Sequence, residues 1–220
     1  MPFTVGVRRF TFTTHVASSV GWAGAVVVFL ALAIIGLTSE DEATVRGAYL
    51  VMAPAAWFVL VPLAHASLLS GISLSLGTTW GLFRHYWVVF KLVITVFSTI
   101  VLLIYMETFR QMAGVAADPV VELDLVRNPS PVLHAVLAFA LLLTATVLGV
   151  YKPFGMTAYG LRKQNQERLT FSSSAPPRRT VRDADAVPSA PRWLFVPALI
   201  ALGLLLLFVL LHLSGAGFRH

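Results

Sequence analysis

The chain has 220 residues, of which 57% are hydrophobic and only 12% are charged, and its mean hydropathy is +0.81. Because a soluble domain carries about 25% charged residues, this composition excludes a water-soluble globule. The absence of cysteine excludes disulfides, thiolate metal sites and covalent haem attachment. The net charge of +6 comes from basic residues between long apolar runs, and it indicates membrane orientation rather than binding of a nucleic acid.

Five stretches are apolar enough for transmembrane helices, each of which needs about 20 residues. In chain order they are residues 16–37, 47–76, 86–106, 131–151 and 193–213. The second is the longest and contains Pro54 and Pro62, which predict kink points. We therefore expect an all-α integral membrane protein, with a four-helix transmembrane bundle in residues 1–152 and a fifth C-terminal transmembrane helix.

The segment between the fourth and fifth predicted helices, residues 153–192, is basic, and its second half is rich in Ser, Pro, Ala and Arg. This composition predicts a partly disordered cytoplasmic linker. Residues 193–220 are then the fifth transmembrane helix and a short outer tail. The loop between the third and fourth helices has room for a short surface helix.

The distribution of basic residues predicts the orientation. With the N-terminus in the cytoplasm and five spans, 12 of the 16 Lys and Arg residues fall inside. We therefore expect a multi-pass protein of the cell membrane with its C-terminus outside. Its expected partner is the lipid bilayer and not a nucleic acid, and a homo-oligomer or a larger membrane complex remains open.

Histidines are among the few polar groups inside the predicted spans, where each polar group needs a reason. His15 shares a helix face with Ser18, Ser19 and Trp22, and His65 lies in the second span near the same cytoplasmic surface. Two imidazoles on facing helices are the usual axial ligands of haem b in a membrane bundle. We therefore predict a haem b site with iron ligands His15 and His65, lined by Trp22 and Ser19.

The third span carries a polar stripe, because Lys91, Thr95 and Ser98 follow one another at helical spacing. We expect this stripe to face the interior of the bundle. Lys91 has the alternative of extending to the cytoplasmic headgroups.

Two segments resemble a known family. The segment HVASSVGWAGAVVVF, from His15 to Phe29, resembles the first helix of HemJ-type protoporphyrinogen oxidases and CopD-type membrane proteins. The segment GISLSLGTTWGLFRHYWVVFKLVITV, from Gly71 to Val96, is similar to their connection between the second and third helices. The resemblance implies a four-helix bundle, haem b bound through His15, and a functional lysine at Lys91.

Three functions follow as hypotheses. The first is a haem-b-binding membrane protein with a redox or electron-transfer role on a porphyrinogen or a quinone, which as an enzyme would be an oxidoreductase with Lys91 as its catalytic residue. The second is a cofactor-free accessory or scaffold subunit. The third is a copper-handling membrane protein, although the chain has no cysteine and its methionines form no cluster in the sequence.

Overall fold

A computed structural model of the chain describes residues 3–78, 80–125, 127, 129–152, 155–174, 196 and 203. All the elements it describes are helical. They are α1 (Val5–Thr38), α2 (Glu42–Ala55), the π-helix η1 (Ala56–Leu60), α3 (Val61–Gly77), α4 (Tyr86–Ala117), the 3-10 helix η2 (Leu123–Leu125), α5 (Ser130–Tyr151) and α6 (Ala158–Ser174). The predicted all-α fold is therefore confirmed for the described residues.

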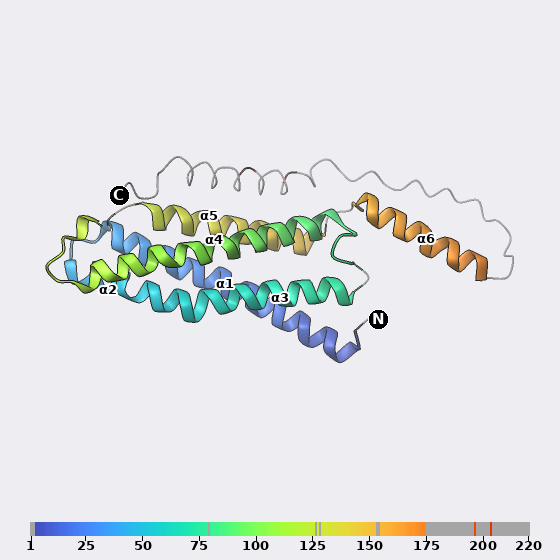
Figure 1. Cartoon of the computed structure of the whole chain (residues 1–220), viewed down its shortest axis with the longest axis horizontal. Helices are drawn as coiled ribbons and strands as arrows, with labels where there is room; N and C mark the ends of the chain where they lie inside the picture. The colour runs from blue at the N-terminus through green and yellow to red at the C-terminus, as the bar shows by residue number, and fades with distance from the viewer. Residues whose placement is uncertain are drawn as a thin grey trace.

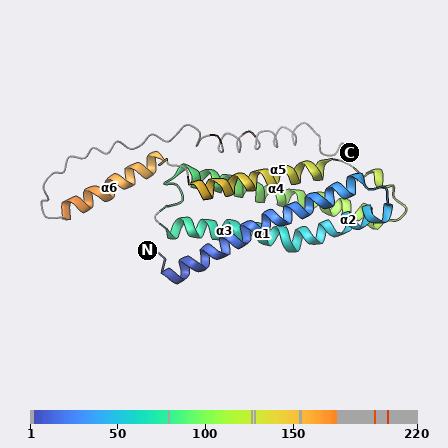
Figure 2. The same ribbon diagram turned by 180° about the vertical axis from the view of Figure 1, so that it is seen from behind.

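Helices α1, α4, α5 and the continuous α2–η1–α3 run side by side along the long axis of the molecule (Figure 1). α1 crosses α3 obliquely and also packs against α5 and α2, as the view from behind shows (Figure 2). α4 completes the bundle by packing against α2, α3 and α5. We call the end with Arg8, Arg84 and Lys152 the basic end, and the end with Asp41, Glu42 and Glu107 the acidic end.

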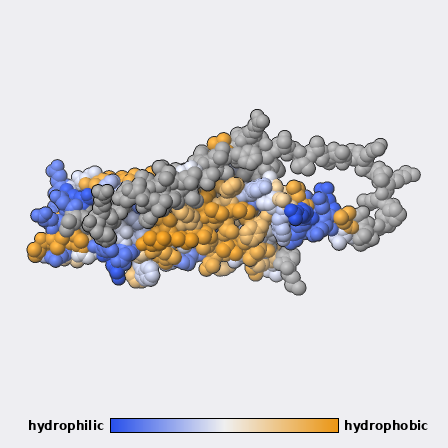
Figure 3. Space-filling view, turned by 45° about the horizontal axis from the view of Figure 1, so that its top comes forward, coloured by the Kyte–Doolittle hydropathy of each residue, from blue (hydrophilic) through white to orange (hydrophobic). Residues whose placement is uncertain are grey.

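Four helices are long and apolar enough to cross a membrane: α1, α2–η1–α3, α4 and α5. α1 has 34 residues and a length of about 51 Å at 1.5 Å per residue, so it extends well beyond a hydrocarbon core of about 30 Å. A broad hydrophobic band separates hydrophilic ends on the face shown in Figure 3. The predicted fifth helix lies almost wholly outside the described residues.

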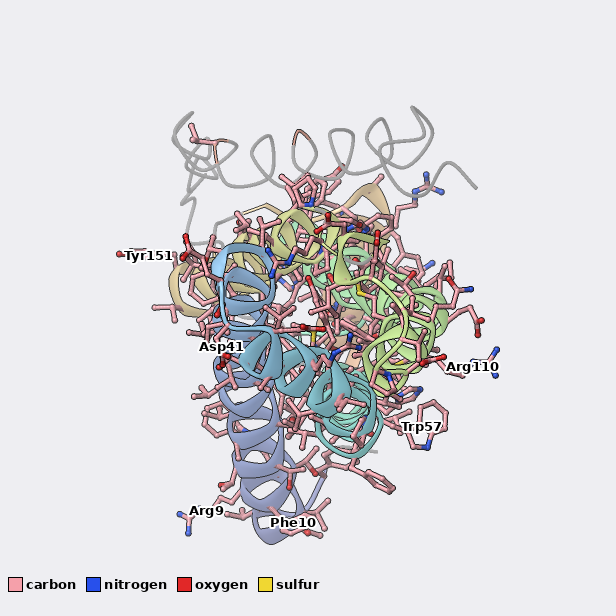
Figure 4. The ribbon with its side chains drawn as sticks, turned by 90° about the vertical axis from the view of Figure 1, so that its left-hand side faces the viewer. Arg9, Phe10, Asp41, Trp57, Arg110 and Tyr151 are labelled. Carbon is pink, nitrogen blue, oxygen red and sulfur yellow. The ribbon has the colours of Figure 1, made fainter. Side chains whose placement is uncertain are left out.

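The second predicted span is interrupted where its prolines lie. Pro54 is inside α2, Pro62 follows the start of α3, and the π-helical turn η1 lies between them. A proline has no amide N–H to donate, so it breaks the regular hydrogen-bond ladder, and a single π-turn is a common way to absorb such a break. Trp57 of this turn points away from the bundle (Figure 4).

The helices extend beyond the predicted boundaries because polar ends continue the apolar runs. α1 begins at Val5 instead of residue 16, and α4 continues to Ala117 instead of ending at residue 106. The segment after residue 106, for which the sequence predicted a loop with room for a short surface helix, therefore begins with the last turns of α4. Its described part contains one further short helix, η2. Asp41 caps α2, because its carboxylate accepts hydrogen bonds from the backbone N–H and hydroxyl of Thr44.

Arg46 of α2 ties the acidic end of the bundle together. Its guanidinium donates to the backbone oxygens of Asp118 at 2.7 Å and Val121 at 3.0 Å, just beyond the end of α4. It also bonds the carboxylate of Glu42 one turn earlier on α2. A cation placed at the C-terminal end of a helix interacts favourably with its dipole.

α6 is attached to the basic end through the loop that joins α3 to α4. Arg84 of this loop forms a 2.9 Å ion pair with Glu167 of α6, and the hydroxyl of Thr157 donates to the backbone oxygen of Phe83 at 2.6 Å. α6 occupies the first half of the predicted linker, where no helix was predicted. It also includes residues 171–174 of the half predicted to be disordered, and the rest of that half lies outside the described residues.

Candidate functional site

Three residues from three different helices meet inside the bundle, toward its basic end: His15, Ser67 and Lys91. The Nδ1 atom of His15 lies 3.0 Å from the backbone oxygen of Ser67 on α3. Its Nε2 atom lies 3.1 Å from the Nζ atom of Lys91 on α4. The imidazole of α1 therefore bridges α3 and α4.

These contacts fix the tautomer of His15. A carbonyl oxygen only accepts hydrogen bonds, so Nδ1 must carry the proton that it donates to Ser67. Nε2 then has a free lone pair, which accepts a hydrogen bond from the ammonium of Lys91. A histidine that donates one N–H to a carbonyl while presenting the other nitrogen is the arrangement typical of metal-ligating imidazoles.

Two glycines make room for this pair. A Cβ atom at Gly71 of α3 would lie 3.0 Å from Cε1 of His15, and a Cβ atom at Gly149 of α5 would lie 3.1 Å from Nζ of Lys91. Both distances are tighter than ordinary van der Waals contact. All four of the long apolar helices thus contribute to the site: α1 and α4 supply the two functional groups, and α3 and α5 supply the space around them.

His15 and Lys91 line a cavity of about 210 Å³ at the basic end. Its wall includes two further cations, Arg8 and Lys152, and the indole rings of Trp80 and Trp87. The two rings contact each other edge to face at 5.5 Å, and the ammonium of Lys152 lies 5.5 Å from the centroid of Trp80. The cavity is therefore basic, with an aromatic wall.

The remaining predicted site residues are placed as follows. Ser19 supports the site from α1, because its hydroxyl is hydrogen-bonded to that of Ser67 at 2.8 Å. Trp22 is buried and lines a second, mostly apolar cavity of about 70 Å³ further along the bundle. The polar stripe faces the interior as predicted, since Thr95 and Ser98 are both buried.

His65 does not line the cavity around His15, and its Nδ1 donates to the backbone oxygen of Val61 one turn earlier on the same helix segment. Residues of a helix are rotated by about 100° per position, so His65 lies about 200° from Ser67 around α3. The face of α3 that contacts His15 consists of Ser67, Ser70 and Gly71. The structure thus brings Lys91 to His15, and it does not bring His65 there.

Several residues of the site are not predicted from the sequence. Ser67, Ser70 and Gly71 recur at helical spacing and could have been recognised as a small polar face. The approach of Gly149 to Lys91 depends on how α5 packs against α4, and nothing in the sequence indicates it. Among the described residues no group of three or more His, Cys, Asp or Glu side chains could hold a metal ion.

No protein-family model matches the chain, and neither the curated proteins nor the solved structures give a match.

Proposed function

We propose that the chain is a haem-b-binding membrane protein with a redox or electron-transfer role, and that haem binds at the cavity around His15. The observation that carries this proposal is the state of the His15 imidazole. Its Nδ1–H is held by the carbonyl of Ser67, and its Nε2, the nitrogen with the lone pair, lies at the cavity wall, where it accepts a hydrogen bond from Lys91. Porphyrinogens and quinones are the proposed substrate classes.

The residues present fit such a group. Haem, when bound, would supply one-electron redox chemistry, and His15 would hold its iron through Nε2 once the ammonium of Lys91 releases that nitrogen. The carbonyl of Ser67 orients the ring and keeps Nδ1 protonated. Arg8 and Lys152 supply positive charge for propionates, and Trp80 and Trp87 supply an apolar wall. The cavity of about 210 Å³ is smaller than the roughly 300–1,000 Å³ typical of pockets for drug-sized ligands, so it would enclose only part of a haem.

The resemblance to HemJ-type and CopD-type proteins supports the same proposal. It carries over to two residues, His15 and Lys91, which lie 76 positions apart in the sequence. In the fold they are joined by a direct hydrogen bond. Lys91 is accordingly the proposed catalytic residue of an oxidoreductase acting at this site.

We place this site at the cytoplasmic leaflet of the cell membrane, with the N-terminus inside. Residues 193–213 would form a fifth span, which puts the C-terminus outside. The charge of the two ends supports this orientation, since Arg8, Arg84 and Lys152 lie at the basic end. The chain has no cysteine, so single cysteines report the orientation directly: Glu40→Cys should react with an impermeant maleimide added outside intact cells, and Gln166→Cys should react only after lysis.

The absorption spectrum tests the haem proposal. The full chain, purified in dodecyl maltoside after expression with added haem precursor, should show a Soret band, with α and β bands after reduction. His15→Ala should abolish the bands, whereas His65→Ala is the matched control and should retain them, because His65 lies outside the cavity. Loss of the bands in both variants would instead support His15 and His65 together as the iron ligands. A colourless wild-type protein would refute the proposal and favour a cofactor-free accessory subunit.

A further inference from the structure

The cavity around His15 contains positive charge without a matching negative charge. Arg8, Lys91 and Lys152 line it, and none of the residues lining it is an aspartate or a glutamate. The ion pairs among the described residues join Arg46, Arg84 and Arg110 to glutamates elsewhere in the structure. The three cations of the cavity therefore have no carboxylate partner within the described part of the chain.

Lys91 is the cation for which this imbalance matters most. Its ammonium has three N–H groups, of which the imidazole of His15 accepts one. On its other side lies the backbone of Gly149, whose missing side chain makes the space that the ammonium fills. A cation withdrawn from water is costly unless an anion accompanies it, so an anion that reaches Lys91 would be held strongly.

A further donor and an apolar wall complete the cavity. The indole N–H of Trp87 is buried and has no hydrogen-bond partner among the described residues. The rest of the wall includes the hydroxyls of Ser75 and Thr78 as well as a set of aliphatic side chains, Leu68, Ile72, Leu74, Leu82 and Leu92. The cavity wall thus combines cationic groups with apolar side chains, which suits a ligand with an anionic group on an apolar body.

We infer that this cavity selects its ligand through an anionic group, a carboxylate or a phosphate, which Lys91 binds together with Arg8 and Lys152. This inference deepens the proposed function, because it concerns the same cavity. It is independent of iron, however, since it assigns recognition to the cations and not to His15. The anion comes either from a soluble ligand with carboxylates or from the phosphate of a membrane lipid.

A metal-free porphyrin separates anion recognition from iron ligation. The full chain in dodecyl maltoside is titrated with protoporphyrin, which has two carboxylates, and with its dimethyl ester, which has none. Binding is followed by quenching of tryptophan fluorescence. The wild type should prefer the acid over the ester by about tenfold more than Lys91→Met does, because a hydrogen bond to a charged group is worth about one order of magnitude in affinity. Comparing the ratio between variants cancels partition into the micelle.

Neighbouring residues provide matched controls. Arg8→Gln should reduce the preference for the acid, whereas Arg9→Gln should not, because Arg9 does not line the cavity and points away from the bundle (Figure 4). If Lys91→Met fails to fold, Lys152→Asn tests the same point. Lys152 has a positive φ of 42° after α5, and asparagine tolerates this conformation while removing the charge.

Nanodiscs distinguish the two sources of the anion. If phosphatidylglycerol weakens binding of the acid to the wild type but not to Lys91→Met, a lipid phosphate occupies the site. If phosphatidylglycerol affects both proteins equally, the ligand's carboxylate is the anion.

Equal acid-to-ester ratios in the wild type, Lys91→Met and Lys152→Asn would overturn the inference. A Soret band that depends on His15 would still support the haem proposal in that case, so the two failures are distinguishable.

Discussion

Replacing Arg46 by methionine should destabilise the acidic end of the bundle more than any other loss of a single surface charge there. The Arg46 side chain is only 16% exposed, and its guanidinium makes two well-formed bonds, to the backbone oxygens of Asp118 and Val121. A hydrogen bond from a charged donor contributes about 1.5–3 kcal/mol, so these two backbone bonds together contribute at most roughly 6 kcal/mol. Water can replace part of this, and we expect a loss of about 3 kcal/mol in the free energy of unfolding.

The free energy of unfolding is measured in mixed micelles by raising the fraction of dodecyl sulfate and following the loss of helical circular dichroism. Arg110→Met is the matched control, because Arg110 is 77% exposed and, within the described part of the chain, pairs only with Glu107 on its own helix, a contact worth about 0–1 kcal/mol. Arg46→Lys should fall between the two, since an ammonium keeps the charge but lacks the planar fork. A loss for Arg46→Met no greater than that for Arg110→Met would refute the reasoning.

Three further predictions concern the site, a helix cap and the attachment of α6. Gly149→Ala should fold normally but displace the ammonium of Lys91, and so weaken protoporphyrin binding several-fold in the fluorescence titration. Hydrogen bonds from the first turn of α2 lower the pKa of Asp41 below its ordinary value of 3.8, so the stability that this cap provides is present above pH 3.8 and is lost as the pH falls through the lowered pKa. Asp41→Asn should flatten that acid limb of the stability curve, and an unchanged limb would contradict the assignment. Glu167→Gln should speed proteolysis of α6 by removing its ion pair with Arg84, whereas cleavage at the wild-type rate would show that the pair does not hold α6.

The long apolar runs of the sequence were sufficient to predict the helical class and four of the helices. Hydropathy is a sum over neighbouring residues and depends little on tertiary contacts, so it places a span such as 131–151 within one residue of α5. It misplaced the ends of α1 and α4, because polar residues continue a helix into water without changing its apolar centre. α6 escaped prediction for a related reason: it is polar, and its described contacts with the α3–α4 loop involve residues more than 70 positions away.

Sequence spacing also identified His15 and Lys91 as rare polar groups inside apolar helices, and it assigned the polar stripe of α4 to the interior. Only the tertiary structure decided which groups meet. The depth of a residue in a span follows from its position in the chain, but its partner depends on the rotation and crossing of helices, which are set by close packing of small residues such as Gly71 and Gly149. That packing turns Ser67 of α3 toward His15 and leaves His65, only two residues earlier, on another side of the same helix.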